Sequence, residues 1–392
     1  MSLFLGALGI VNSLGSGKEP VREAVMRGDQ AGIRVHGYPA GDFHVARTTA
    51  PASTLTIRPP YVNRVNSLLA AACDQILPEV EETVRRYGRD QVAVLVGSTD
   101  NGSEETTAAL IHRTRSGRFP DGYSLLQMQA HLPALFVADY LGLTNIAAAA
   151  STACSSSASA ITIARNLIEM GLCRAAVVGG ADIVSESVLY GFHALEAVDR
   201  GRCNPFSRNR RGINLGEGAA LFVLGPEPVD GQEIRLLGSG ETSDAYHMTA
   251  PAPGGEGAQR AMRRALEDAA LAPGDVDYVN LHGTGTVLND SMESKAMHAV
   301  FPEGVACSST KALAGHTLGA AGAMELGFCW LALTAANVGR QLPPHVWDGE
   351  LDPALPALDL VPAQRRAARL QICMSNSFAF GGCNVSLVIG RS

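Results

Sequence analysis

Short runs of apolar residues recur along the chain, separated by amphipathic or glycine-rich stretches. A run of this kind bounded by turn residues predicts a buried strand. We expect strands at residues 2–11, 91–97, 146–150, 175–184, 219–225, 277–282 and 385–390. The run QVAVLVG at 91–97 shows no alternation of polar and apolar positions, which is typical of a strand buried on both faces of its sheet.

Apolar residues at helical spacing predict helices between these runs. We expect helices at residues 19–28, 62–87, 125–141, 258–270 and 318–338. The Gly-, Pro- and Thr-rich segment that runs to residue 60 is predicted to be irregular. The polar segment 101–122 is predicted to lie at the surface or at a subunit contact. Strands that alternate with helices indicate an α/β protein with buried sheets.

The two halves of the chain end in similar sequences. GEGAALFVLG, which ends at Gly225, and GGCNVSLVIG, which ends at Gly390, both place glycines directly before an apolar strand. This similarity suggests an internal duplication. We therefore divide the chain into two domains, residues 1–230 and 231–392.

Composition argues against several classes of protein. The net charge of −7 and the aromatic content of 5% argue against a general role in nucleic-acid binding. The eight cysteines are scattered, without CxxC pairs, which argues against a zinc site or a disulfide framework and favours a reducing cytoplasm. The N-terminal apolar run lacks a basic leader, and the long apolar stretch 318–338 is interrupted by Glu325 and Asn337. We therefore predict neither a signal peptide nor membrane insertion.

The stretch STACSSSASAI at 151–161 carries the first chemical signal. It follows a small apolar run and leads into apolar residues at helical spacing, so Cys154 is predicted to lie where a helix begins. Backbone N–H groups at a helix start are unpaired and carry the positive end of the helix dipole. They favour a thiolate and can stabilise an oxyanion. The alternative is that Cys154 is a small buried core residue.

Two histidines add to this signal. His282 lies in NLHGTGTVLND, where a strand ends and a glycine-rich loop begins, a usual place for a site residue in an α/β fold. His316 lies among small residues in STKALAGHTLGAAGAME. Each histidine alone is better explained by a structural role. Together with Cys154 they suit acyl transfer, because a thiol can carry the acyl group while two neutral imidazoles donate hydrogen bonds to an enolate oxygen.

Six stretches carry a resemblance to a known family. They are TACSSS, NPFSRNRRGINLGEGAA, SDAYHMTAPAPGGEGA, HGTGTVLND, KALAGHTLGAAGAME and SNSFAFGGCN. With these motifs in the same order, the chain resembles the elongating β-ketoacyl-acyl-carrier-protein synthases, the ketosynthases of the thiolase superfamily, over essentially its whole length. The resemblance implies a duplicated thiolase fold in five α-β-α-β-α layers and a homodimer.

The resemblance also implies an activity. It is the decarboxylative Claisen condensation of a cysteine-bound acyl chain with a malonyl unit on an acyl carrier protein, in fatty-acid, polyene or type II polyketide biosynthesis. No cofactor is needed for this chemistry, since the substrates arrive on the phosphopantetheine arm of the carrier. Cys154 would accept the acyl chain, with its own N–H and that of Phe380 as oxyanion hole. His282 and His316 would hold the malonyl thioester carbonyl, and Lys311 would fix the position and charge state of His316.

Other positions match by the same resemblance. Thr284 and Thr286 would contact the pantetheine arm, and Phe380 would be the gating aromatic. A structural monovalent cation, Na⁺ or K⁺, would be held by oxygen ligands from Asn280, Glu293, Glu325, Ser375 and Asn376. The alternative is that the two glutamates join a buried hydrogen-bond network with Lys311 or with backbone N–H groups.

Departures from the family pattern leave alternatives open. Ala379 replaces the glycine usual before the gating phenylalanine, which puts the motion of the gate in question. Cys383 stands where threonine is common and is the candidate second cysteine of a coenzyme A-dependent thiolase. A non-catalytic chain-length-factor subunit usually lacks the nucleophile that this chain has, whereas the active half of a ketosynthase/chain-length-factor heterodimer remains possible. Carrier docking is assigned to a basic patch drawn from Arg58, Arg64, Arg202, Arg208, Arg210 and Arg211.

Overall fold

The computed structural model describes residues 2–49, 57–100, 102–229, 231 and 233–391. The strands are β1 (Leu3–Asn12), β2 (Gly15–Ser16), β3 (Arg34–Tyr38), β4 (Gly41–Val45), β5 (Val92–Gly97), β6 (Ala147–Ala150), β7 (Ala175–Asp182), β8 (Gly218–Gly225), β9 (Ile234–Ser243), β10 (Tyr278–Asn280), β11 (Ala306–Ser308), β12 (Asp359–Leu360), β13 (Ile372–Phe378) and β14 (Cys383–Arg391).

The α-helices are α1 (Lys18–Arg27), α2 (Arg64–Tyr87), α3 (Ser103–Ser116), α4 (Leu132–Leu141), α5 (Ser156–Glu169), α6 (Glu186–Ala194), α7 (Glu256–Asp268), α8 (Val287–Val300), α9 (Lys311–Ala314) and α10 (Ala321–Leu333). Short 3₁₀ turns are η1 (Arg89–Gln91), η2 (Leu125–Met128), η3 (Ala153–Ser155), η4 (Pro273–Asp275), η5 (Leu318–Ala320) and η6 (Phe380–Gly382). No helix of the described ranges is long and apolar enough to cross a membrane.

The order of the strands shows the internal duplication. In the first half, β8 pairs antiparallel with both β1 and β7, and β5 pairs parallel with both β7 and β6. In the second half, β14 pairs antiparallel with both β9 and β13, and β10 pairs parallel with both β13 and β11. The two halves therefore repeat one topology, and β8 and β14 are the two strands whose similar sequences suggested it. A short pairing of β1 with β9 joins the halves.

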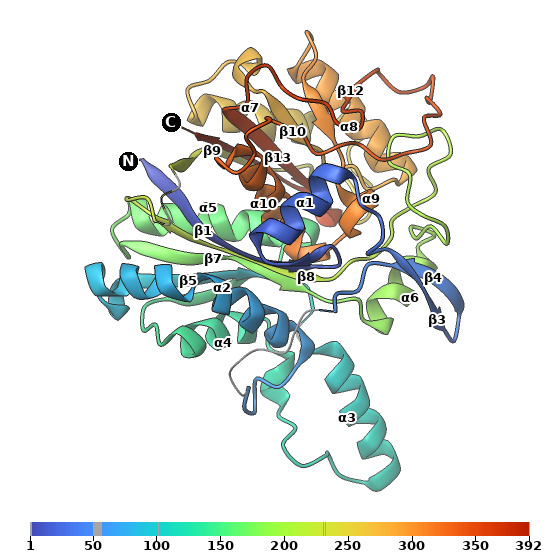
Figure 1. Ribbon diagram of the computed structural model, residues 1–392. Coiled ribbons are helices and arrows are strands. Elements are labelled where there is room, and N and C mark those ends of the chain that lie inside the picture. The colour runs from blue at the N-terminus through green and yellow to red at the C-terminus, as the bar shows by residue number, and fades with distance from the viewer. Residues whose placement is uncertain (1, 50–56, 101, 230, 232, 392) are drawn as a thin grey trace.

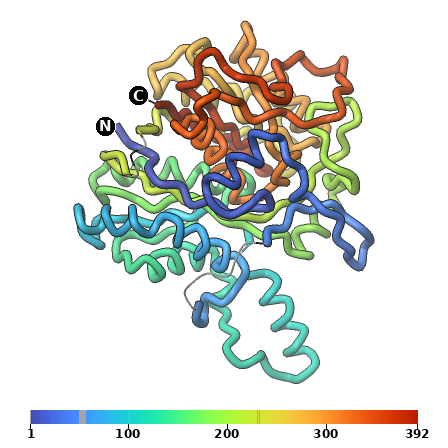
Figure 2. Tube along the Cα trace, in the orientation of Figure 1, coloured from blue at the N-terminus to red at the C-terminus, as the bar shows by residue number. Residues whose placement is uncertain are grey.

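Five layers follow from this arrangement (Figure 1). Helices α5 and α10 pack against each other between the sheets of the two halves, where the largest group of buried apolar residues lies. Helices α2 and α4 cover the outer face of the first sheet, and α7 and α8 cover the outer face of the second. The fold is the α-β-α-β-α duplicated thiolase fold that the resemblance implied. The trace of α3 and the segment after it projects away from these layers (Figure 2).

Four predicted segments differ in the structure. The segment predicted to be irregular contains the β3–β4 hairpin, whose strands are tied in antiparallel register from Arg34 to Val45. The polar segment 101–122 contains α3, which carries Glu104 and Glu105 in its first turn and arginines in its last turn, as suits the helix dipole. The predicted helix 125–141 is two pieces, η2 and α4, because the chain restarts α4 with a proline in its first turn.

The predicted helix 318–338 is also shorter. It is the 3₁₀ turn η5 followed by α10, which ends at Leu333 because Thr334 takes an extended conformation. The amide of Asn337 then donates hydrogen bonds to the carbonyls of Ala332 and Gln341 and satisfies this end of the helix. Residues 50–56 of the predicted irregular segment, residue 101, and residue 230 at the predicted domain boundary lie outside the described residues.

Candidate active site

Cys154 lies on a sharp turn between strand β6 and helix α5. The turn is η3, in which Ala153 has a positive φ of 52°, and α5 begins two residues after the cysteine, at Ser156. The backbone packs closely here, since a Cβ at Gly97 of the neighbouring strand β5 would lie 2.2 Å from the Ser157 nitrogen. The prediction that Cys154 stands where a helix begins is confirmed.

The two histidines come from loops of the second half. The loop of His282 follows β10 and is fixed by Glu293 of α8, whose carboxylate accepts the backbone N–H groups of His282 at 2.8 Å and Gly283 at 2.7 Å. The loop of His316 follows α9, and the His316 backbone N–H donates to the carbonyl of Asn214 at 2.7 Å. Both imidazoles are therefore held by backbone anchors rather than by their own side-chain contacts alone.

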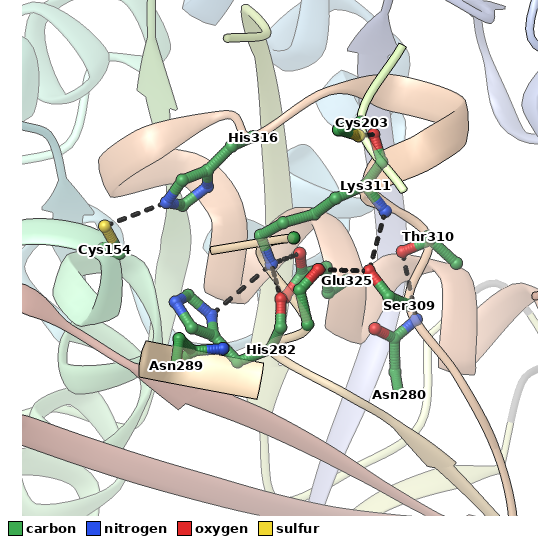
Figure 3. A network of polar contacts seen from close by, with 12 residues as sticks. Cys154, Cys203, Asn280, His282, Asn289, Ser309, Thr310, Lys311, His316 and Glu325 are labelled. Carbon is green, nitrogen blue, oxygen red and sulfur yellow. Dashed lines mark hydrogen bonds and ion pairs between the residues drawn. The ribbon is translucent and has the colours of Figure 1, made fainter. Parts of the chain in front are cut away.

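The structure brings Cys154, His282 and His316 together (Figure 3). The His316 Nε2 lies 2.9 Å from the Cys154 Sγ, and the centroids of the two imidazole rings are 5.4 Å apart with the rings nearly perpendicular. The sulfur and one nitrogen of each ring lie within 4.8 Å of one another. All three side chains are at most 5% exposed.

Burial sets the protonation states of this group. It raises the pKa of the Cys154 thiol to about 12, against the opposing effects of the Lys311 charge and of the Phe380 N–H that bonds to the sulfur. Burial and the Lys311 charge hold the pKa values of His282 and His316 well below the usual value. The resting site therefore contains a thiol and two neutral imidazoles. Burial opposes the thiolate that the helix start favours, so the thiol needs a base, and His316 is within reach.

Lys311 contacts His282 and not His316, the histidine that was expected. Its Nζ forms a buried ion pair with Glu325 of α10, donates to the His282 carbonyl, and lies 3.4 Å from the His282 Nδ1 (Figure 3). It reaches His316 only through its charge, which lowers the pKa of that imidazole. The expected control of the charge state of His316 therefore has a physical basis, whereas the expected control of its position does not. The Lys311 side chain is drawn toward Glu325 because an unpaired buried carboxylate is costly.

A cavity of about 270 Å³ opens in front of the sulfur. Thr284 and Thr286 line it, with their hydroxyls 2.9 Å apart, and Phe380 lines it with its ring 5.6 Å from that of Phe192. Ala379 has φ −94° and ψ 156°, an ordinary extended conformation, so its methyl group is compatible with this position of the loop. Cys383 does not line the cavity, which places the candidate second cysteine of a thiolase outside the site.

The candidate cation ligands divide into two groups. The Asn280 Oδ1, the Glu325 Oε2 and the Ser375 Oγ are buried without a hydrogen-bond partner among the described residues. Asn280 and Ser375 are paired across β10 and β13. Glu293 is satisfied by backbone N–H groups, and the Asn376 Oδ1 accepts the Ser386 hydroxyl at 2.8 Å. Three of the five predicted ligands thus offer a free oxygen atom that fits a hard cation. The alternative network is also present, because Glu293 bonds to backbone N–H groups and Glu325 pairs with Lys311.

The predicted docking arginines also divide. Arg64 forms an ion pair with the fully buried Glu217, and the buried Arg210 bonds to Asp352 at 2.5 Å. Both therefore serve the fold rather than a docking surface. Arg211, in contrast, is exposed and lines the cavity. The others are exposed as well: Arg208 lies 3.7 Å from Glu350, Arg202 bonds to Gln30, and Arg58 stands before α2.

Two residues near the site were not predicted from sequence. Phe192 of α6 lines the cavity against Phe380, and Asp182 ends strand β7 beneath the His316 loop. The only signal for Asp182 was an acidic residue at the end of an apolar run, GGAD, in a strand otherwise buried on both faces. Nothing in the pattern distinguished Phe192 from a core aromatic.

The fold is duplicated and has five layers. Its site combines a nucleophilic cysteine on a central helix of the first half with two imidazoles on loops of the second half. This combination defines a condensing acyltransferase of the thiolase type. The family comparisons then place the chain within that class. The β-ketoacyl synthase N-terminal domain matches residues 35–228, and the β-ketoacyl synthase C-terminal domain matches residues 234–345. The chain belongs to the β-ketoacyl synthase family.

Curated relatives agree with this assignment. The 3-oxoacyl-[acyl-carrier-protein] synthase 2 of Staphylococcus aureus (strain COL) is 31% identical over 349 residues, 84% of this chain and 82% of the relative. The enzyme of that name from Synechocystis sp. is 31% identical over 350 residues with the same coverage. The chain is thus a β-ketoacyl synthase, an acyltransferase that works in the chemistry of fatty-acid and polyketide assembly.

Solved structures show the same fold. A chain in the complex of the ketosynthase ApeO with its chain length factor ApeC from Xenorhabdus doucetiae aligns with a TM-score of 0.92 and 40% identity, over 100% of this chain and 98% of that chain. The ishigamide ketosynthase/chain length factor aligns with a TM-score of 0.88 and 26% identity, over 100% and 99%. A β-ketoacyl synthase from Burkholderia phymatum STM815 aligns with a TM-score of 0.82 and 29% identity, over 100% and 99%.

Proposed function

We propose that Cys154 is the residue acylated in this β-ketoacyl synthase and that both substrates arrive on an acyl carrier protein. The observation that carries the proposal is the convergence of the Cys154 sulfur with the ring nitrogens of His282 and His316 in one buried cavity. In the first step His316 takes the thiol proton, the sulfur attacks the thioester carbonyl, and the N–H groups of Cys154 and Phe380 stabilise the oxyanion. The carrier thiol leaves with the proton from His316.

In the second step the two imidazoles act as donors, His316 after its proton has moved from Nδ1 to the Nε2 that acylation leaves unprotonated. Lys311 donates to the Nδ1 of His282, so the proton of that ring stays on the other nitrogen, which lies on the Cys154 side in Figure 3. His282 and His316 bond to the malonyl thioester oxygen while the bond to the carboxylate breaks. Carbon dioxide leaves, and its bonding electrons form an enolate. The enolate carbon attacks the acyl group, and the Cys154 thiolate leaves and takes a proton from solvent.

The test of this proposal separates a ketosynthase from a thiolase. Purified enzyme given acyl-carrier and malonyl-carrier should form the β-ketoacyl-carrier and one carbon dioxide for each condensation. Acetyl-coenzyme A alone should give no acetoacetyl product. Product from acetyl-coenzyme A without loss of carbon dioxide would contradict the proposal and support the thiolase alternative.

We further propose that this chain is the cysteine-bearing subunit of a heterodimer with a chain-length-factor-like partner. Two of the structural relatives are complexes of this kind. The chain also offers a surface for a partner. Strand β6 lies at the edge of the sheet, and large apolar side chains are exposed on α3, on η2 and beside β6: Leu110, Ile111, Leu125, Leu126, Met128 and Ile146.

Assembly and activity together test the second subunit. We expect a 1:1 complex and condensation when the chain is co-expressed with a chain length factor, for which ApeC is the available probe, and no efficient condensation by the chain alone. Light scattering with size-exclusion chromatography measures the assembly. A homodimer of the chain alone with full condensation activity would overturn the heterodimer and restore the homodimer expected from the resemblance.

Two smaller points complete the proposal. A monovalent cation would be held by the free oxygens of Asn280, Glu325 and Ser375, beside the ion pair that Glu325 makes with Lys311. A reducing compartment such as the cytoplasm suits the cysteines, since all eight are free thiols and seven of them are buried.

A further inference from the structure

Asp182 is a fully buried carboxylate at the end of strand β7. The carboxyl ends of β7 and its parallel neighbour β5 lie side by side, next to the start of the nucleophile helix α5. Burial raises the pKa of Asp182 to about 7, and hydrogen bonds from Thr99 and Gly319 act in the opposite direction. A buried carboxylate is tolerated only where several donors surround it, so the donors show what this side chain holds.

The donors come from two loops that belong to different halves of the chain. From the loop after β5, Asp182 accepts the Thr99 hydroxyl at 2.6 Å, the Thr99 N–H at 3.0 Å, the Asp100 N–H at 2.8 Å and the Ser98 hydroxyl at 3.2 Å. From the other half it accepts the Gly319 N–H at 2.6 Å. The carboxylate therefore joins the end of the first sheet to the segment that carries His316.

The contact with Gly319 is close to the catalytic group. Gly319 lies in η5, three residues after His316, and the intervening Leu318 has a positive φ of 53°. A Cβ at Gly319 would lie 2.7 Å from the Asp182 Oδ2 and 2.9 Å from the Thr99 nitrogen. The loop thus packs directly against the carboxylate, without room for even a methyl group between them.

The other side of the same contact is the nucleophile helix. A Cβ at Gly180, two residues before Asp182, would lie 2.7 Å from the Ser157 Cβ and 3.3 Å from the Gly319 carbonyl oxygen. The end of β7 is therefore wedged between the first turn of α5 and the His316 loop. These are the two segments whose spacing sets the 2.9 Å distance from the His316 Nε2 to the Cys154 Sγ.

We propose that Asp182 is a positioning residue of the ketosynthase reaction, which sets the distance between His316 and Cys154 by holding the Gly319 N–H. It touches no substrate and acts through His316. The His316 backbone has a second anchor, since its N–H bonds to Asn214 and its carbonyl accepts the Gly216 N–H at 2.8 Å. Loss of the Asp182 contact should therefore displace the imidazole without releasing the loop.

The variant D182N tests this role. Its amide places an NH₂ group at one of the two carboxylate oxygens. At Oδ2 the Gly319 and Thr99 contacts are lost together, and at Oδ1 the Asp100 and Ser98 contacts are lost. We expect the turnover of condensation to fall roughly 10- to 100-fold with little change in KM for malonyl-carrier, because small displacements of a catalytic group cost about this much. The rate of Cys154 alkylation by iodoacetamide at neutral pH should fall as well. The alkylation readout requires neither a particular chain length nor the second subunit.

The control is S98A. The Ser98 hydroxyl donates to Asp182 and to the Asp100 carbonyl but, among the described residues, makes no hydrogen bond to the His316 loop. The S98A substitution removes one hydrogen bond of the same network. If the network had only a structural role, S98A and D182N should lose similar amounts of turnover and of alkylation rate. We expect S98A to keep both rates within about twofold of wild type. Equal losses in S98A and D182N would overturn the proposal.

A double-mutant cycle decides whether Asp182 acts through His316. In the background of H316A, D182N should cause no further loss of alkylation rate, whereas an independent effect would give the same fold-loss in both backgrounds. The second outcome would overturn the proposal. If D182N does not fold, G319A replaces it in the cycle. Gly319 has no positive φ, so its backbone dihedrals allow alanine, and the methyl group, for which there is no room, displaces the loop from Asp182 and Thr99.

Discussion

The two active-site histidines should differ in which step they serve. His316 lies 2.9 Å from the Cys154 sulfur, whereas His282 bonds to Lys311. Replacing His316 with alanine should therefore slow both acylation of Cys154 and decarboxylation of malonyl-carrier. Replacing His282 with alanine should slow decarboxylation and leave acylation within a few-fold of wild type. The sequence alone predicted that both histidines act after acylation, and the structure changes that prediction for His316.

The size of the effect follows from the buried thiol. With its pKa raised to about 12, the Cys154 thiol has a thiolate fraction on the order of 10⁻⁵ at pH 7 unless a base takes the proton. Loss of a positioned general base typically costs ~10²- to 10⁴-fold, and we expect that range for acylation in H316A. Loss of one oxyanion donor costs ~10²- to 10³-fold, and we expect that range for decarboxylation in both H282A and H316A.

A third variant separates the two roles of His316. In H316Q the amide nitrogen takes the place of the Nε2 and can donate a hydrogen bond, but it cannot accept a proton. H316Q should therefore decarboxylate faster than H316A and acylate equally slowly. Acylation is followed by intact-mass spectrometry after rapid mixing with acyl-carrier, and decarboxylation by carbon dioxide release from malonyl-carrier. Wild-type acylation rates in H316A and H316Q would refute the assignment of His316 as the base.

Three further predictions follow from buried and exposed charges. Burial lowers the pKa of His345 to about 4, so its stability contribution is present above pH 6.5 and is lost as the pH falls from 6.5 to 4, by about 3 kcal/mol. Urea unfolding of H345Q should lack this part of the pH dependence, and an unchanged dependence would refute it. When tetramethylammonium in the buffer is replaced by K⁺ or Na⁺, the Tm of the wild type should rise by roughly 1–3 °C and that of S375A should rise less. Equal Tm values of the wild type in the two buffers would leave no role for a cation. Charge reversal in R211E should raise the KM for carrier-bound substrate, and the increase should be larger at low salt. An equal increase in KM for a small pantetheine thioester would contradict a docking role.

Much of the fold could be predicted because its sheets are buried on both faces. Strands such as β5 and β7 are continuous apolar runs, and only a two-sided burial explains such runs. Helix α8 was missed for the opposite reason. Its buried face mixes the apolar Met292, Ala296, Met297 and Val300 with Asn289, Asp290, Glu293 and Ser294, so the apolar pattern is interrupted. Asp290 and Glu293 accept backbone N–H groups of the His282 loop. Helix α3 was missed because it buries only Thr106 and Ala109.

The site was predictable in its reactive groups but not in its electrostatics. The turn that presents Cys154 follows from local sequence. The raised pKa of Cys154 does not, because it depends on how much of the chain covers the thiol. The partner of Lys311 was assigned to His316 by position, yet its side chain pairs with Glu325, a choice made by tertiary packing. Asp182 could not be predicted, since its donors lie as far as 137 residues away in sequence.

The most direct test of the central claim is the site of acylation. Wild-type enzyme and C154A are incubated with acyl-carrier, and intact-mass spectrometry is followed by peptide mapping. Cys383, the one cysteine that is only partly buried, provides a matched control as C383A. We predict one acyl adduct per chain on the Cys154 peptide of wild type and C383A, and none on a correctly folded C154A. An adduct that persists in C154A, or that maps to Cys383, would contradict the account.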